Sequence, residues 1–202
     1  MDTILSPKSV AIIGVSENPE KVGSVMMQNL LETGYNGKIY PVNPKYTELQ
    51  GRKAYPSILE INEEIDMVCI ALPYQAVEEV VDQCIEKKVK SVLIVSAGFA
   101  ETGPEGKELE ERITNKLKGA RIRLIGPNCL GFINNKVKID LTFARSNPGD
   151  GNIAFISQSG AFCTAILDMA SEGGLGFSHV ISVGNKADIN ENELLPYFLN
   201  NN

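Results

Sequence analysis

A glycine-containing loop follows the first apolar run of the chain, and its residue types are those that bind phosphate. The apolar run is Ser9–Val15, and the loop begins at its end with Gly14 and continues through Ser16 and Lys21 to Gly23. A glycine after a buried strand lets the backbone turn sharply and lets a ligand approach the amides. The helix that follows directs its free N–H groups and the positive end of its dipole at that ligand. We therefore expect a phosphate-bearing nucleotide here; the alternative is a plain strand-to-helix turn.

The position that selects the nucleotide carries a lysine instead of an acid. NAD-binding domains have G-x-G-x-x-G and, about 20 residues later, an Asp or Glu that bonds the ribose hydroxyls. This chain lacks that glycine pattern, and the corresponding place after Gly23 holds Asn43, Pro44 and Lys45. A lysine attracts a phosphorylated ribose, so the sequence argues against NAD and leaves coenzyme A (CoA) and NADP. The alternative is that Lys45 is a solvated loop residue.

A second turn of this kind lies late in the chain. The segment Ser157-Gln158-Ser159-Gly160 follows the apolar run Asn152–Ile156 and precedes an expected helix over Ser159–Ser171. A strand, a Ser/Gly turn and a helix N-terminus together form an anion site. The alternative is that Ser159 is only a structural N-cap.

Short β-branched apolar runs alternate with amphipathic stretches over the first part of the chain. The expected strands are Ser9–Val15, Lys38–Asn43, Asp66–Leu72, Lys90–Ala97 and Ile122–Gly126, and the expected helices are Lys21–Thr33, Gln75–Lys87 and Pro104–Leu117. Continuous apolar strands separated by helices predict an α/β fold with a Rossmann-like parallel sheet covered on both faces. Ligands of such sheets bind at the carboxyl ends of the strands.

The strand and helix pattern restarts after the turn-rich segment Ala144–Gly151. The later strands are expected at Asn152–Ile156 and Ser178–Val183, and the helices at Ser159–Ser171 and Glu191–Leu199. Two strands and two helices cannot close a doubly wound domain, so we expect the second domain to be incomplete.

Composition excludes several classes of function. The net charge is −6, which disfavours nucleic-acid binding. The chain has one histidine and four cysteines without a C-x-x-C pair, so no metal site is expected. Cysteine sparseness, the lack of a signal peptide and the shortness of the apolar runs predict a cytoplasmic, soluble protein with no membrane span. Cys69 and Cys84 are expected in the core, whereas Cys129 follows a Pro-Asn turn and could be exposed.

Several segments together resemble one family. They are Val10–Ser16 with Pro19, Lys21 and Gly23; Ile39–Lys45; Ala54–Ser57; Ser96–Phe99 with Glu101; Gly126–Gly131; Ile156–Ala161; and Gly184–Asp188. In that order and spacing they resemble the α part of nucleoside-diphosphate-forming acyl-CoA synthetases, such as ADP-forming acetyl-CoA synthetase. Succinyl-CoA synthetase α is a more distant relative. The resemblance covers essentially the whole chain.

The resemblance implies a CoA-binding domain at residues 1–130, a connecting segment at 131–150 and the N-terminal part of a flavodoxin-like domain at 151–202. It implies that an ATP-grasp β subunit or domain binds ATP or ADP with Mg. Acyl-CoA and phosphate would give acyl phosphate and CoA, and the phosphoryl group would pass through a histidine to ADP. That histidine is expected beyond Asn202, so this chain would bind CoA without turnover. The full enzyme is expected to be an oligomer.

The resemblance also assigns residues to sites. The CoA-binding residues would be Gly14, Val15, Ser16, Lys21, Gly23, Val42, Asn43, Pro44, Lys45, Pro73, Ser96, Ala97 and Gly98. The phosphate and thioester site would hold Asn128, Cys129, Ser157, Gln158, Ser159 and Gly160. No catalytic residue is expected within the chain.

His179 lies in an expected apolar strand and is interpreted as structural, since nucleophilic work needs an exposed imidazole. Two other functions remain open at this point. One is a non-enzymatic, CoA-binding regulatory module. The other is an NADP-dependent oxidoreductase, for which the sequence offers no obvious catalytic acid or base.

Overall fold

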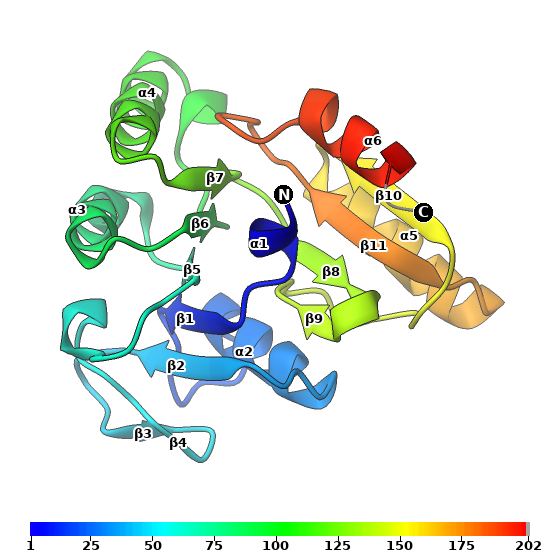
Figure 1. Ribbon diagram of the computed structural model, residues 1–202, viewed down its shortest axis with the longest axis horizontal. Helices are drawn as coiled ribbons and strands as arrows, with labels where there is room; N and C mark the ends of the chain where they lie inside the picture. The colour runs from blue at the N-terminus through cyan, green and yellow to red at the C-terminus, as the bar shows by residue number, and fades with distance from the viewer. Residues whose placement is uncertain (201–202) are drawn as a thin grey trace.

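The computed structural model describes residues 1–200 and contains two main sheets (Figure 1). The first sheet has the order β2-β1-β5-β6-β7 and all of its pairings are parallel. Its strands are β1 (Ser9–Ile13), β2 (Lys38–Val42), β5 (Met67–Ile70), β6 (Ser91–Ile94) and β7 (Arg123–Ile125). This arrangement confirms the predicted Rossmann-like parallel sheet.

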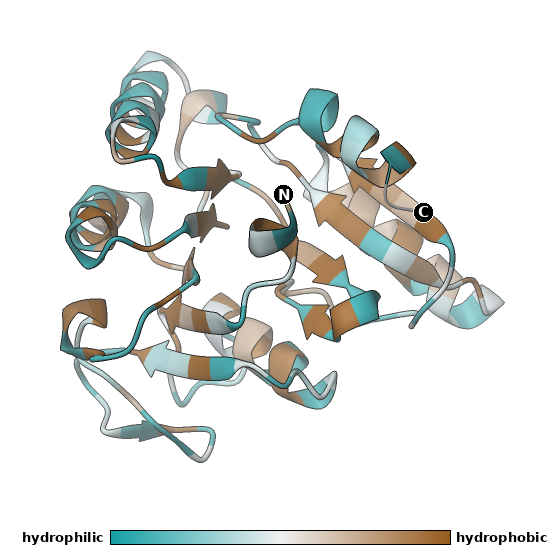
Figure 2. Ribbon diagram, in the orientation of Figure 1, coloured by the Kyte–Doolittle hydropathy of each residue, from teal (hydrophilic) through white to brown (hydrophobic). Residues whose placement is uncertain are grey.

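Helices cover both faces of this sheet because successive strand residues point to opposite sides. Val10 and Ile12 of β1 share a core with α2, whereas Ala11 and Ile13 share a core with α3 and α4. The helices are α2 (Val22–Glu32), α3 (Val77–Lys87) and α4 (Pro104–Gly119). Figure 2 shows the apolar residues concentrated on the strands and on the inner sides of these helices.

Several short elements could not be predicted from the periodicity of the sequence. They are α1 (Asp2–Leu5), the hairpin of β3 (Glu48–Leu49) with β4 (Arg52–Lys53), and the 3₁₀ helices η1 (Ile58–Glu60), η2 (Tyr74–Ala76), η3 (Ala100–Thr102) and η4 (Asn135–Val137). Each is too short to show a helical or alternating pattern.

The second sheet has the order β10-β11-β8-β9 and is mixed. Strands β10 (Ile153–Ser157) and β11 (Phe177–Ser182) are parallel, whereas β8 (Phe132–Asn134) and β9 (Ile139–Asp140) pair antiparallel. The helices α5 (Gly160–Gly173) and α6 (Glu191–Asn200) complete this part. Strands β8 and β9 lie inside the segment 131–150, which sequence analysis expected only to connect two domains. That interpretation missed them because they are three and two residues long.

The two sheets share one hydrophobic core. Met26 and Met27 of α2 belong to the same buried cluster as Phe132, Leu141 and Ile181. Hydrogen bonds reinforce this contact: Asn29 Nδ2 on α2 donates to Thr142 O at 3.0 Å and to Ala144 O at 2.8 Å. The second sheet is therefore fixed against the first.

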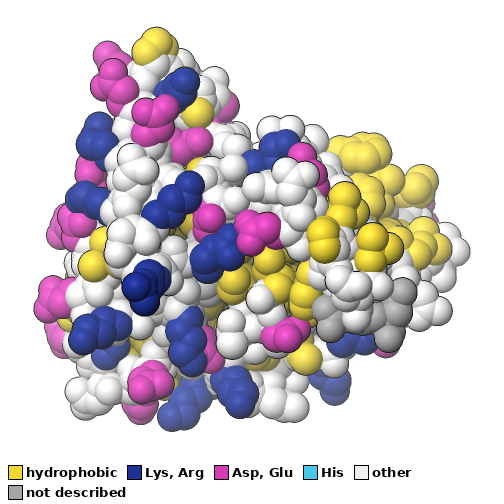
Figure 3. Space-filling model, turned by 45° about the horizontal axis from the view of Figure 1, so that its top comes forward, with side chains coloured by type: hydrophobic (Ala, Val, Ile, Leu, Met, Phe, Trp, Pro, Cys, Tyr) yellow, Lys and Arg dark blue, Asp and Glu magenta, His cyan; other side chains and the backbone are white. Residues whose placement is uncertain are grey.

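The second sheet also carries exposed apolar residues (Figure 3). Phe162 and Met169 of α5 are 54% and 59% exposed, and β10 lies at the edge of its sheet with Ile153 exposed. Among residues 1–200, no helix is long and apolar enough to cross a membrane, and no group of three or more His, Cys, Asp or Glu is placed to hold a metal ion.

The buried carboxyl of Asp140 makes stability depend on pH. Burial raises its pKa from 3.8 to about 6, although hydrogen bonds from Thr142 and Asn147 act in the opposite direction. A folded pKa above the unfolded value means that this group's contribution is fully present below about pH 4 and is lost as pH rises through about 6. The loss amounts to at most about 3 kcal/mol.

We predict that Asp140→Asn removes this contribution to the pH dependence, because an amide oxygen still accepts from Thr142 but cannot ionise. Urea unfolding of both proteins between pH 4 and 7 measures the difference. The control Glu108→Gln, an exposed carboxyl on α4, should keep the wild-type dependence. Parallel curves for wild type and Asp140→Asn would contradict this account.

Candidate functional site

The loop after β1 is shaped by two glycines. Gly14 has φ +97°, and a Cβ there would collide with the carbonyl oxygen of Ala71. A Cβ on Gly23 would lie 2.7 Å from the carbonyl carbon and oxygen of Gly14. Only glycines therefore let the start of α2 pack directly on the end of β1.

The loop is closed by internal hydrogen bonds and leaves the helix N-terminus free for a ligand. Ser24 Oγ accepts from Ser16 N at 3.0 Å and donates to Ser16 O at 2.8 Å. Lys21 occupies the N-cap of α2, where no side chain caps the helix, and no acidic residue lies in the first turn. Uncapped amides and an uncompensated helix dipole favour a phosphate at this end.

A cavity of about 480 Å³ lies beside this loop, at the carboxyl ends of β1 and β2. Its apolar lining includes Ile13, Leu72 and Val80. Of the residues predicted to bind the cofactor, the cavity is lined by Gly14, Ser16, Val42, Asn43, Pro44 and Lys45. The others do not line it: Val15 is fully buried, and Lys21, Gly23, Pro73, Ser96, Ala97 and Gly98 lie outside.

The end of β2 presents Lys45 to solvent at this cavity. Asn43 Nδ2 donates to Val15 O at 2.7 Å, and Asn43 Oδ1 accepts from Lys45 N at 3.0 Å. Asn43 thus ties the β2 end to the glycine loop. Lys45 is exposed and makes no ion pair with any residue between 1 and 200, so its ammonium is available to an anion.

The loops after β5 and β6 are packed together. Ser96 Oγ donates to Leu72 O at 2.5 Å, so this predicted site residue holds the two loops in contact. Gly98 has φ +111°, and a Cβ there would lie 2.7 Å from Cγ of Tyr74. Pro73 is exposed and forms the N-cap of η2, directly before Tyr74.

The turn after β7 does not expose a thiol. Cys129 is 4% exposed, its Sγ donates to Ile94 O at 3.4 Å, and burial raises its pKa to about 12. The expectation that this thiol could be exposed is therefore wrong, because the side chain turns into the core. Asn128, the preceding residue, has φ +55°, and its Nδ2 donates to Asn185 Oδ1 at 3.2 Å.

The loop after β10 has the geometry of an anion site in which both serine hydroxyls already make hydrogen bonds within the turn. Ser159 Oγ accepts from Phe162 N at 3.2 Å and caps α5, and Ser157 Oγ accepts from Ser159 N at 3.1 Å. Gly160 opens the helix beside Leu130, and Gln158 is exposed. The N-cap interpretation and the anion-site interpretation of Ser159 are compatible, since one cap leaves further amides of the first turn unbonded.

His179 has the contacts of a structural residue. Its Nδ1 lies 3.2 Å from Ser178 Oγ, and its ring centroid lies 4.7 Å from that of Phe198. Burial lowers its pKa, so the ring stays neutral at pH 7. These contacts agree with the interpretation from sequence.

Sequence reasoning missed residues on α3 and after β4. Glu79 and Gln83 lie one helical turn apart and both line the cavity, with Ser57 Oγ donating to Gln83 Oε1 at 3.0 Å. Their spacing on the polar side of an amphipathic helix was a usable signal. Glu101 and Asn185 stood in segments quoted for the resemblance, but sequence alone gave them no partner.

The comparisons with known proteins agree with this geometry. The chain matches the family of the CoA binding domain over residues 8–135 and the succinyl-CoA ligase like flavodoxin domain over residues 150–202. Because the first match covers more than half of the sequence, the chain belongs to the CoA binding domain family.

Its curated relatives are longer proteins. The chain is 49% identical over 193 residues to the ADP-forming acetate–CoA ligase of Methanocaldococcus jannaschii, covering 96% of this chain and 27% of the relative. It is 43% identical over 202 residues to the α subunit of ADP-forming acetate–CoA ligase I of Pyrococcus furiosus, covering 98% of this chain and 44% of the relative. The chain thus spans less than half of each relative's length.

A solved structure has the same fold over nearly the whole chain. Acetyl-coenzyme A synthetase 1 of Ca. Korarchaeum cryptofilum, in complex with phosphate and ADP, superposes with a TM-score of 0.94 at 36% identity. The match covers 98% of this chain and 42% of that one.

Burial of all four cysteines predicts that the native protein resists thiol reagents. Burial raises the pKa of every one of these thiols, and none is more than 4% exposed. We expect Ellman's reagent at pH 8 to react slowly with the folded chain and with four thiols after denaturation. The variant Ala165→Cys, on the exposed side of α5, should react at once and serves as a control. Rapid reaction of a native thiol would contradict the buried placement of Cys129.

Proposed function

We propose that the chain binds CoA at the carboxyl edge of the first sheet and is the CoA-binding α part of an ADP-forming acyl-CoA ligase. One observation carries the proposal: the cavity beside the glycine loop combines an apolar lining with Lys45 at its edge, which makes no ion pair within residues 1–200. CoA brings an adenine ring, a phosphorylated ribose and a diphosphate. The apolar lining suits the ring, Lys45 suits the ribose phosphate, and the N-terminus of α2 suits the diphosphate.

The loops near the second sheet fit the remainder of such a ligand. We propose that the pantetheine arm runs past Pro73 and the Ser96–Gly98 loop toward Asn128. The helix N-terminus at Ser157–Gly160 would then hold phosphate or a phosphohistidine. The sequence-based domain bounds, 1–130 and 151–202, stay predictions.

In the proposed full reaction, acyl-CoA, ADP and phosphate interconvert with carboxylic acid, CoA and ATP through an acyl phosphate and a phosphohistidine. In this proposal the phosphohistidine lies in a part of the full ligase that this chain does not cover, and an ATP-grasp domain or subunit supplies ATP or ADP with Mg. The names of the relatives, which are CoA ligases, support this proposal over an NADP-dependent oxidoreductase and over a purely regulatory module.

We predict that Lys45→Glu weakens CoA binding more than dephospho-CoA binding, because only CoA carries the ribose phosphate. A charge-assisted hydrogen bond contributes about 1.5–3 kcal/mol, so the CoA dissociation constant should rise at least about tenfold. Calorimetric titration of both ligands measures the difference. Lys38→Glu makes the same charge change at the opposite end of β2 and should leave the CoA preference intact. If Lys45→Glu lowered the affinity for both ligands equally, Lys45 would not be the residue that binds the ribose phosphate.

A further inference from the structure

The loop after β11, residues 184–186, lies between the two parts of the candidate site. Val183 N donates to Ser157 O at 2.9 Å, which joins the start of this loop to the Ser157–Gly160 turn. Asn185 N donates to Pro127 O at 2.9 Å. Gly184 has φ +55°, and a Cβ there would lie 2.6 Å from Asn128 O. The loop therefore packs on the turn after β7 and is hydrogen-bonded to the Ser157–Gly160 turn, called the anion turn below.

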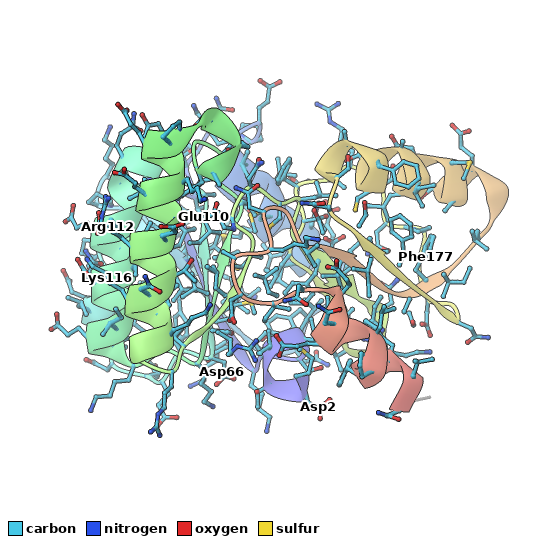
Figure 4. All side chains as sticks on the ribbon, turned by 90° about the horizontal axis from the view of Figure 1, so that it is seen from above. Asp2, Asp66, Glu110, Arg112, Lys116 and Phe177 are labelled. Carbon is cyan, nitrogen blue, oxygen red and sulfur yellow. The ribbon has the colours of Figure 1, made fainter. Side chains whose placement is uncertain are left out.

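The side-chain amide of Asn185 bridges three other side chains. Its Nδ2 donates to Glu101 Oε2 at 2.6 Å and to Glu110 Oε2 at 2.7 Å, and its Oδ1 accepts from Asn128 Nδ2 at 3.2 Å. The reverse orientation of the amide would set Oδ1 against two carboxylates, so the network fixes which atom is nitrogen. In Figure 4, Glu110 lies on the side of α4 that faces this loop, whereas Arg112 and Lys116 lie on the other side.

The two carboxylates in turn hold the loop after β6. Glu101 Oε1 accepts from Gly98 N at 2.6 Å and from Phe99 N at 3.2 Å, and Glu110 Oε2 accepts from Ala100 N at 3.2 Å. Burial acts to raise the pKa of Glu101, but the hydrogen bonds from Asn185 and the backbone outweigh it and lower the pKa below its ordinary value.

We propose that Asn185 is a positioning residue, which holds the Ser96–Gly98 loop in the geometry that receives the pantetheine arm and keeps it in register with the anion turn. This inference rests on the proposed function. Asn185 supplies the two N–H groups that the facing carboxylates share. Without them the like charges repel, and the backbone amides that the carboxylates bind move with them.

The test compares two ligands. CoA reaches the Ser96–Gly98 loop through its pantetheine arm, whereas adenosine 3′,5′-bisphosphate carries only the base, ribose and phosphates. In calorimetric titration, we expect Asn185→Ala to lower the affinity for CoA about tenfold, because hydrogen bonds to charged groups are lost. The affinity for adenosine 3′,5′-bisphosphate should not change. Asn192→Ala, an exposed amide on α6, should change neither affinity.

A swapped pair separates positioning from general stability. Asn185→Asp alone places a third carboxylate in the network and should weaken CoA further. Adding Glu101→Gln places an amide N–H opposite the carboxylate introduced at position 185. The amide oxygen of the glutamine still accepts from the amides of Gly98 and Phe99, so CoA affinity should partly recover. Thermal unfolding of each variant, followed by circular dichroism, shows whether the fold is retained.

The outcomes are distinct. Unchanged CoA affinity in Asn185→Ala, equal loss of both ligands, or no recovery in the swapped pair would overturn the positioning role and leave CoA binding intact. Failure of the wild-type chain to bind either ligand would overturn the proposed function and this inference together.

Discussion

The packing of both sheets into one hydrophobic core is the constraint on which the site depends. Phe132, Leu141 and Ile181 from the second sheet are buried with Met26 and Met27 of α2, so the sheets cannot rotate independently without exposing this cluster. Burial of such side chains contributes about 1.5–3 kcal/mol each, so the shared core stabilises the contact between the two parts. The loops at the ends of β7, β10 and β11 meet because this core fixes the strands that carry them.

The cavity edge provides a cation on a molecule that is acidic overall. The chain has a net charge of −6, yet the cavity edge carries Lys45 without an ion-pair partner among residues 1–200. The first turn of α2 likewise contains no acid. Glu79 also lines the cavity, so the attraction on a phosphorylated ligand is local to Lys45 and the N-terminus of α2. The glycines Gly14 and Gly23 bring the helix end close enough to the β1 end for this attraction to act on one ligand.

Much of the first sheet could be predicted from sequence, because its five strands are continuous apolar runs and its helices have clear apolar stripes. Gly14, Asn43 and Lys45 could be placed in one site because carboxyl ends of neighbouring parallel strands lie at one edge. Strands β8 and β9 could not be found, since two or three residues show no periodicity. The burial of Cys129 depends on the path of the turn after β7, and the contact of Asn185 with Glu101 joins residues 84 positions apart. Neither the burial of Cys129 nor the Asn185–Glu101 contact leaves a local pattern in the sequence.

The most direct test of the central claim is a calorimetric titration of the chain with CoA, dephospho-CoA, NAD and NADP. We predict that CoA binds, that dephospho-CoA binds more weakly, and that NAD does not bind. Binding of NADP or NAD without binding of CoA would contradict this prediction, and would assign the cavity at the end of β2 to a nicotinamide nucleotide.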